Sequence, residues 1–115
     1  MSRIGKKFEK LGGKTAFIGY ITAGDPSIET TKDLVLAMEK GGCDIIELGV
    51  PYSDPVADGP VIQAAAQRAL DNGVTVKKIF EVVEDIRKES QIPLVFKGDC
   101  SINMLLFSLL QYYLC

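Results

Sequence analysis

The chain has no histidine and no tryptophan, and only three of its 115 residues are cysteine. Because histidine is the commonest general base and the commonest zinc ligand, its absence excludes Ser-His-Asp and Cys-His mechanisms built from these residues. The cysteines, Cys43, Cys100 and Cys115, are odd in number and widely spaced. That pattern favours a reducing compartment over a disulfide-bonded secreted framework.

Neither sign of charge dominates, since 13 basic residues stand against 15 acidic ones for a net charge of −2. The sequence has no block of basic residues, so we expect no nucleic-acid partner and no membrane surface. Residues 1–10 lack the apolar core of a signal peptide, which predicts a cytoplasmic protein. With 47% hydrophobic and 24% charged residues, the composition is that of one small globular domain.

Strand-like and helix-like segments alternate along the chain. We expect strands at 15–22, 43–50 and 92–96, and helices at 2–11, 27–40, 60–71 and 75–89. Asp25 or Ser27 is suited to cap the second helix. Such alternation indicates a parallel sheet, either doubly wound or closed into a (β/α)8 barrel. Both architectures place their sites at the C-terminal ends of strands.

The second expected strand carries the first candidate site residue. Alternation with a period of two puts Ile46, Leu48 and Val50 on one face, and Ile45, Glu47 and Gly49 on the other. The first face suits packing against helices. The second face places Glu47 among apolar neighbours, where a carboxyl group can both donate and accept a proton. The simpler interpretation, a glutamate on a solvated edge, fits a strand covered on both faces less well.

The loop 51–60 supplies two more carboxylates, Asp54 and Asp58. Asp58 stands just before the third helix, so it either caps that helix or binds an N–H group and balances developing positive charge. A Mg²⁺ site made of Glu47, Asp54 and Asp58 is the weakest alternative, because a turn role explains Asp54. We therefore expect no metal.

Tyr20 stands near the end of the first expected strand. One interpretation is a core aromatic residue. The other is one wall of a pocket for a flat, apolar ring.

Two segments resemble the tryptophan synthase alpha chain family, namely 17–26 (FIGYITAGDP) and 46–63 (IELGVPYSDPVADGPVIQ). The resemblance runs from about residue 5 to residue 96. It implies the N-terminal portion of a (β/α)8 TIM barrel, with three parallel strands and an N-terminal helix. The implied activity is that of a lyase of tryptophan biosynthesis, which cleaves indole-3-glycerol phosphate to indole and glyceraldehyde 3-phosphate by a retro-aldol reaction.

The resemblance also implies roles for single residues. Glu47 falls on the family's general acid/base, which protonates the indole carbon and takes the hydroxyl proton. Asp58 falls on the carboxylate that binds the indole N–H and stabilises the positively charged intermediate, and Tyr20 falls on a wall of the indole pocket. The loop 51–60, with Pro51 and Asp54, falls on the one that contacts the beta chain.

The resemblance implies no cofactor for this chain. In the family, pyridoxal phosphate is bound by the beta chain, with which the alpha chain forms an α2β2 heterotetramer.

The chain departs from the family after the third expected strand. We expect a partial barrel over 1–97 and an aberrant, apolar, uncharged tail over 98–115. A shifted reading frame or a mis-assigned gene explains such a tail, and a buried helix or a short membrane segment are the alternatives. A (β/α)8 barrel takes about 250 residues, so we expect the late phosphate-binding loops to be missing from these 115 residues. We expect a chain truncated in this way to be inactive alone, with a non-catalytic or partner-binding remnant as the alternative function.

Overall fold

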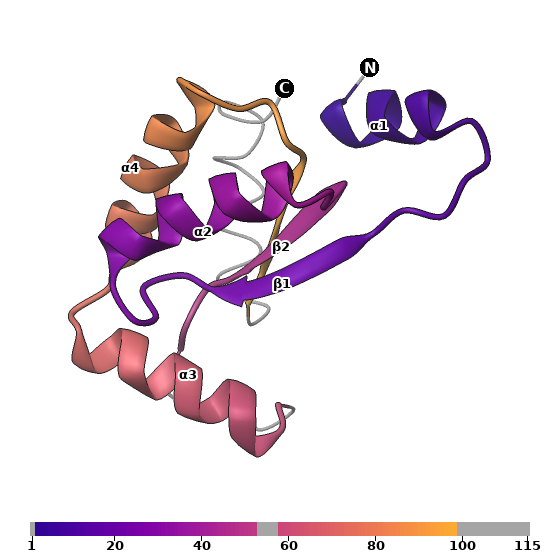
Figure 1. The fold of residues 1–115 in the computed structure, drawn as a ribbon. Helices are drawn as coiled ribbons and strands as arrows, with labels where there is room; N and C mark the ends of the chain where they lie inside the picture. The colour runs from indigo at the N-terminus through magenta and orange to yellow at the C-terminus, as the bar shows by residue number, and fades with distance from the viewer. Residues whose placement is uncertain (1, 53–57, 99–115) are drawn as a thin grey trace.

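The computed structural model describes residues 2–52 and 58–98 (Figure 1). In chain order the elements are α1 (Arg3–Leu11), β1 (Ile18–Thr22), α2 (Ile28–Lys40), β2 (Ile45–Gly49), α3 (Pro60–Asp71), α4 (Val76–Arg87) and β3 (Leu94–Lys97). The strands form one parallel sheet in the order β1-β2-β3. The predicted alternation and the parallel sheet are therefore confirmed.

Serine or threonine side chains cap the N-termini of three helices. The hydroxyl oxygens of Ser2, Ser27 and Thr75 accept hydrogen bonds from backbone N–H groups in the first turns of α1, α2 and α4. Each bond satisfies a donor that has no partner inside its own helix. Of the two candidates for the cap of α2, the structure therefore selects Ser27.

One face of the sheet packs against α2 and α4, which lie together on one side of it (Figure 1). Ile46 and Leu48 are fully buried there, and Val50 is 3% exposed. Helix residues Val35, Ile79, Val83 and Ile86 complete this core. The facing predicted for the second strand is thus confirmed, and burial of each such side chain stabilises the fold by about 1.5–3 kcal/mol.

The opposite face carries the candidate site residues. Tyr20 on β1 lies level with Glu47 on β2, which in turn lies level with Val95 on β3. One step further along, Gly49 lies level with Lys97. Because neighbours in register point to the same side of a sheet, these side chains share one face.

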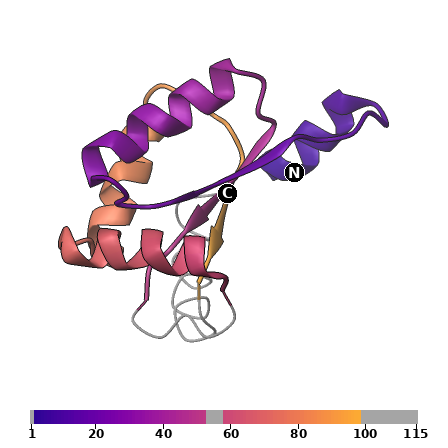
Figure 2. The ribbon, with the colours of Figure 1, turned by 60° about the horizontal axis from the view of Figure 1, so that its bottom comes forward.

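Helices α1 and α3 lie at opposite ends of the sheet. Figure 2 shows α1 standing apart beyond the start of β1, and α3 lies near the ends of the strands. Helix α1 has no buried residue, and Phe8 is 50% exposed. Among the described residues, none of the helices is both long and apolar enough to cross a membrane.

Candidate active site

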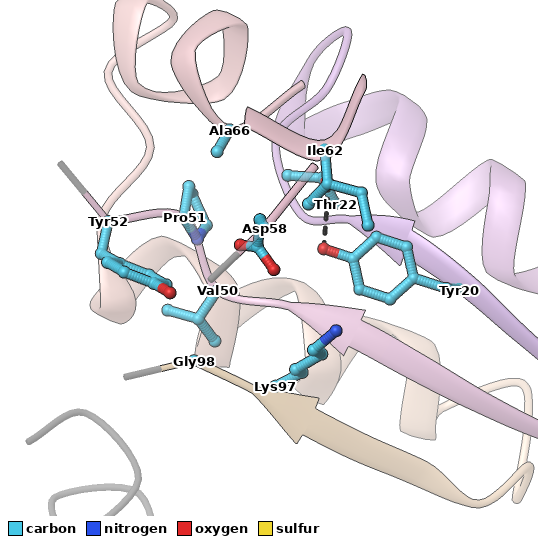
Figure 3. Close-up of a pocket in the computed structure, with 10 residues that line it drawn as sticks. All are labelled: Tyr20, Thr22, Val50, Pro51, Tyr52, Asp58, Ile62, Ala66, Lys97 and Gly98. Carbon is cyan, nitrogen blue, oxygen red and sulfur yellow. Dashed lines mark hydrogen bonds between the residues drawn. The ribbon is translucent and has the colours of Figure 1, made fainter. Parts of the chain in front are cut away.

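Side chains from four segments meet at the C-terminal end of the sheet (Figure 3). Tyr20 and Thr22 come from the end of β1, and Lys97 comes from the end of β3. Asp58 precedes α3, and Ala66 extends from within that helix. These residues line a cavity of about 30 Å³ together with the chain that leaves β2. Parallel α/β folds bind ligands at this end of the sheet.

The Tyr20 side chain lies against Gly49 of the neighbouring strand. Its hydroxyl group is 3.3 Å from the hydroxyl oxygen of Thr22. A methyl group added at Gly49 would collide with the Tyr20 ring and hydroxyl, so only glycine leaves room for the ring there. The amine of Lys97 lies 5.4 Å from the centre of the same ring. Tyr20 thus faces the cavity, as the pocket interpretation requires.

Glu47 lies beside Tyr20 on the same face and is partly buried. It is not among the residues that line the small cavity. Within residues 2–52 and 58–98, no hydrogen bond or ion pair engages its carboxylate. An unengaged carboxylate on this face is free to exchange a proton with a ligand.

Asp58 does not cap α3. The residue at the cap position is Gly59, and no side chain makes a capping hydrogen bond there. The capping interpretation of Asp58 is therefore wrong, because the cap lies one residue later, at Gly59, and Pro60 has no N–H group to donate to a side chain. Instead, the Asp58 carbonyl accepts a hydrogen bond from Gln63 Nε2 at 2.7 Å. Its carboxylate points into the cavity toward Tyr20 (Figure 3).

A clamp between distant segments positions α3. The Arg68 guanidinium donates two hydrogen bonds of 2.9 Å to the Asp25 carboxylate, in the loop between β1 and α2. Asn72 donates to the carbonyl oxygens of Gly24 and Pro26 in the same loop. The hydrogen bonds from Arg68 hold the pKa of Asp25 below its usual range, more strongly than the attraction of the charges does.

Three residues near the cavity were not predicted from the sequence as part of the site. The Asp25–Arg68 pair joins residues 43 positions apart, and no local pattern reveals such a pair. Lys97 is the last residue of the expected partial barrel, and the structure places its amine at the cavity beside Tyr20. Its position at the end of a predicted parallel strand was the available signal.

Some of the predicted residues cannot be placed. Asp54 lies outside the described residues, and so does the chain beyond Gly98. The three-carboxylate magnesium alternative therefore has only two of its members in the structure. Among the residues that the structure describes, no group of three histidine, cysteine, aspartate or glutamate side chains is arranged to hold a metal ion. Pro51 lies in the cavity lining.

A parallel sheet with crossover helices on one face and polar groups at the strand ends is the arrangement of the first units of a (β/α)8 barrel. Comparison with protein families agrees with this class. Residues 7–103 match the family described as "Tryptophan synthase alpha chain". The chain belongs to this family.

Curated relatives match most of this chain but a minor part of their own length. The tryptophan synthase alpha chain of Thermoanaerobacter sp. (strain X514) is 62% identical over 98 residues, which cover 84% of this chain and 37% of the relative. The alpha chain of Alkaliphilus metalliredigens is 61% identical over 98 residues, which again cover 84% of this chain and 37% of the relative. The chain thus spans 37% of the length of these curated relatives.

Solved structures confirm the fold. Tryptophan synthase subunit alpha from Legionella pneumophila superposes with a TM-score of 0.83 at 39% identity, covering 97% of this chain and 42% of that chain. The tryptophan synthase complex from Pyrococcus furiosus superposes with a TM-score of 0.73 at 37% identity, covering 79% and 38%. The prediction of the N-terminal part of a TIM barrel is confirmed.

Proposed function

We propose that this chain supplies the catalytic-carboxylate wall of a site that cleaves indole-3-glycerol phosphate to indole and glyceraldehyde 3-phosphate. One observation carries the proposal: Tyr20 lies level with Glu47 on one sheet face and lines the same cavity as Asp58. Both carboxylates are therefore directed to the space around one aromatic ring. Within the described residues neither carboxylate is engaged by another group.

Glu47 is proposed as the proton carrier. Its carboxyl group first protonates the indole carbon that carries the glycerol chain. The resulting carboxylate then removes the proton from the substrate hydroxyl group next to the indole, while the carbon–carbon bond breaks and its electron pair returns to the positively charged ring. A carboxyl group can perform both transfers when no other group holds it. Among the described residues, the Glu47 carboxylate has no hydrogen-bond or ion-pair partner.

Asp58 is proposed to bind the indole N–H. Protonation of the ring carbon leaves positive charge on the indole nitrogen, and a fixed carboxylate at hydrogen-bond distance stabilises that charge. The Arg68–Asp25 clamp holds the helix that follows Asp58. The Tyr20 ring would supply a flat surface for the indole.

The described wall does not enclose a substrate by itself. Its cavity of about 30 Å³ has room for little more than a water molecule, whereas ligand pockets occupy about 300–1,000 Å³. We therefore propose that the 115-residue chain is inactive alone and that activity needs the remaining walls of a complete barrel. Detectable indole release from indole-3-glycerol phosphate by the purified chain would contradict this proposal.

The decisive experiment joins residues 1–97 to the remainder of the Thermoanaerobacter alpha chain and measures indole formation. In this complete barrel, Glu47→Gln is expected to lower kcat by about 10²–10⁴-fold, because glutamine keeps the size but carries no proton. KM should change little. Glu81→Gln, the same change on an exposed position of α4, is the matched control. If Glu47→Gln retains more than a tenth of kcat, Glu47 is not the proton carrier.

Asp58→Asn in the same barrel separates a chemical role from a structural one. Because Asp58 does not cap α3, the thermal midpoint should stay within about 2 °C while kcat falls. A lower midpoint with unchanged kcat would assign Asp58 to folding instead.

The partner proposal concerns the chain that follows β2. We propose that loop 51–60, with Pro51 and Asp54, contacts a tryptophan synthase beta chain; a structural neighbour from Pyrococcus furiosus is described as a complex. Calorimetry with purified beta chain tests the contact. Binding by the 115-residue chain without lyase activity would favour the alternative, a partner-binding remnant. Absence of binding by the completed barrel would overturn the contact.

A further inference from the structure

A basic groove lies at the opposite end of the sheet from the candidate active site. It runs between α1 and the segment that leads into β3, and its volume is about 250 Å³. Its lining consists of Arg3, Lys6, Lys7, Lys10, Gln91 and Pro93. Four of the six are cationic and none is acidic, so the groove concentrates positive charge in a chain whose net charge is −2.

The cations form one stripe on α1. Lys6, Lys7 and Lys10 follow Arg3 by three, four and seven residues, so all four lie on one face of the helix. Arg3 Nε donates a 2.9 Å hydrogen bond to Gln91 Oε1, which turns this stripe toward β3. Within residues 2–52 and 58–98, Lys6, Lys7 and Lys10 form no ion pair. Like charges at this spacing repel one another, and a bound anion would relieve that repulsion.

Arg87, which does not line the groove, adds a further positive charge that acts on Arg3. Its Nη1 donates to the Ile92 carbonyl oxygen at 2.7 Å, whereas Nε and Nη2 are buried without a hydrogen-bond partner. Burial, followed by the nearby charge of Arg3, lowers the pKa of Arg87 to about 10, so it stays charged at neutral pH. Glu39 counteracts this effect, but its carboxylate already accepts a 2.6 Å hydrogen bond from Ser90.

We propose that this groove binds a small phosphate-bearing molecule through its phosphate or diphosphate group. Phosphate groups carry more charge and more acceptor oxygens than a single carboxylate, which suits several cations in one place. The groove is smaller than the about 300–1,000 Å³ of ordinary ligand pockets, so it fits an anionic group rather than a whole large ligand. This site is independent of the proposed lyase function.

The test titrates sodium pyrophosphate into the 115-residue chain and follows binding by calorimetry and amide chemical shifts. We expect one saturable site whose shifts map to α1 and residues 91–93. The double variant Lys6→Gln/Lys7→Gln should weaken binding about tenfold, as expected when hydrogen bonds to charged groups are lost. Lys77→Gln/Lys78→Gln on α4 removes the same charge at the other end of the strands and is the matched control. Circular dichroism checks that both variants fold, and Lys10→Gln serves if the double variant does not.

Each outcome decides the proposal. Saturable binding that only the α1 variants weaken supports it, and orthophosphate then shows whether one phosphate group suffices. Equal weakening by the control pair, or the same shifts with sodium chloride of matched ionic strength, would overturn it, because general screening then explains the effect. Absence of pyrophosphate binding would also overturn the proposal. This holds even if a single-stranded RNA oligonucleotide binds to the same groove.

Discussion

The two faces of the sheet use the same strands but differ in what surrounds them. On one face Ile46 and Leu48 are fully buried beneath α2 and α4. On the other face Glu47 and Tyr20 are only partly buried, and Lys97 is exposed. On β2, the residues that face α2 and α4 contribute to stability, whereas on the other face Ile45 and Gly49 are buried and Glu47 is the partly buried residue between them.

This difference explains why a carboxylate is tolerated in the middle of the sheet. A charge on the covered face would be removed from water at a cost of several kcal/mol. On the Tyr20 face Glu47 keeps contact with solvent in this chain. The period of two in the strand therefore separates the residues that stabilise the fold from those proposed to act on a ligand.

The largest effect is expected from Leu48→Ala on the covered face. Leu48 is fully buried in the core, so the change should leave a cavity and lower the free energy of unfolding by about 3 kcal/mol. Urea denaturation followed by circular dichroism measures it. A loss below about 1 kcal/mol would show that this face is not the principal core.

A matched pair of glycine substitutions compares the faces directly. A methyl group at Gly19 would collide with the side chain of Met38, a residue of α2, and one at Gly49 would collide with Tyr20. Gly49→Ala should cost about 1–3 kcal/mol, because the rigid Tyr20 ring must leave its position beside Thr22. Gly19→Ala should cost less, since the colliding atom is the terminal methyl group of the flexible, partly buried Met38 side chain. Denaturation midpoints test the order, and the reverse order would show that the Met38 side chain is held more firmly than the Tyr20 ring.

Glu47→Gln should change the stability of the 115-residue chain very little, by at most about 0.5 kcal/mol in either direction. Its carboxylate has no partner among the described residues, so nothing is broken. The same denaturation experiment applies. A loss comparable to that of Leu48→Ala would place Glu47 in the core and weaken its proposed role.

The smallest effect concerns the clamp that holds α3 near the open face. Since Arg68 lowers the pKa of Asp25, the pair stabilises the fold above the unfolded-state pKa of about 3.9. This contribution is lost as the pH falls through the lower, folded-state pKa. Arg68→Met should therefore make stability depend less on pH below about pH 4. Thermal midpoints from pH 2 to 7 measure this, and an unchanged acid dependence would contradict it.

Much of the fold could be predicted because it depends on local periodicity. The order of strands and helices and the facing of Ile46, Leu48 and Glu47 follow from patterns within one element, and the cap of α2 was narrowed to Asp25 or Ser27. Family membership was predictable from contiguous segments around β1 and β2. The bounds were less accurate, as β1 begins at Ile18 rather than at residue 15.

The parts that could not be predicted join residues far apart in the sequence. The choice between the two interpretations of Asp58 is a local exception, since whether Asp58 or Gly59 is the cap depends on where the chain turns before Pro60. The groove on α1 was missed because its cations are interspersed with other residues. Their common direction also depends on a hydrogen bond to Gln91, 88 positions away.

The sequence by itself determined the barrel class, the facing of the strands and the identity of the candidate carboxylates. Only the tertiary structure decided that Arg68 clamps Asp25, that Lys97 approaches Tyr20 and that the basic stripe of α1 faces the start of β3. The physical reason is the range of the interactions. Backbone periodicity fixes where side chains point within one element, whereas these contacts exist only after packing has brought separate elements together.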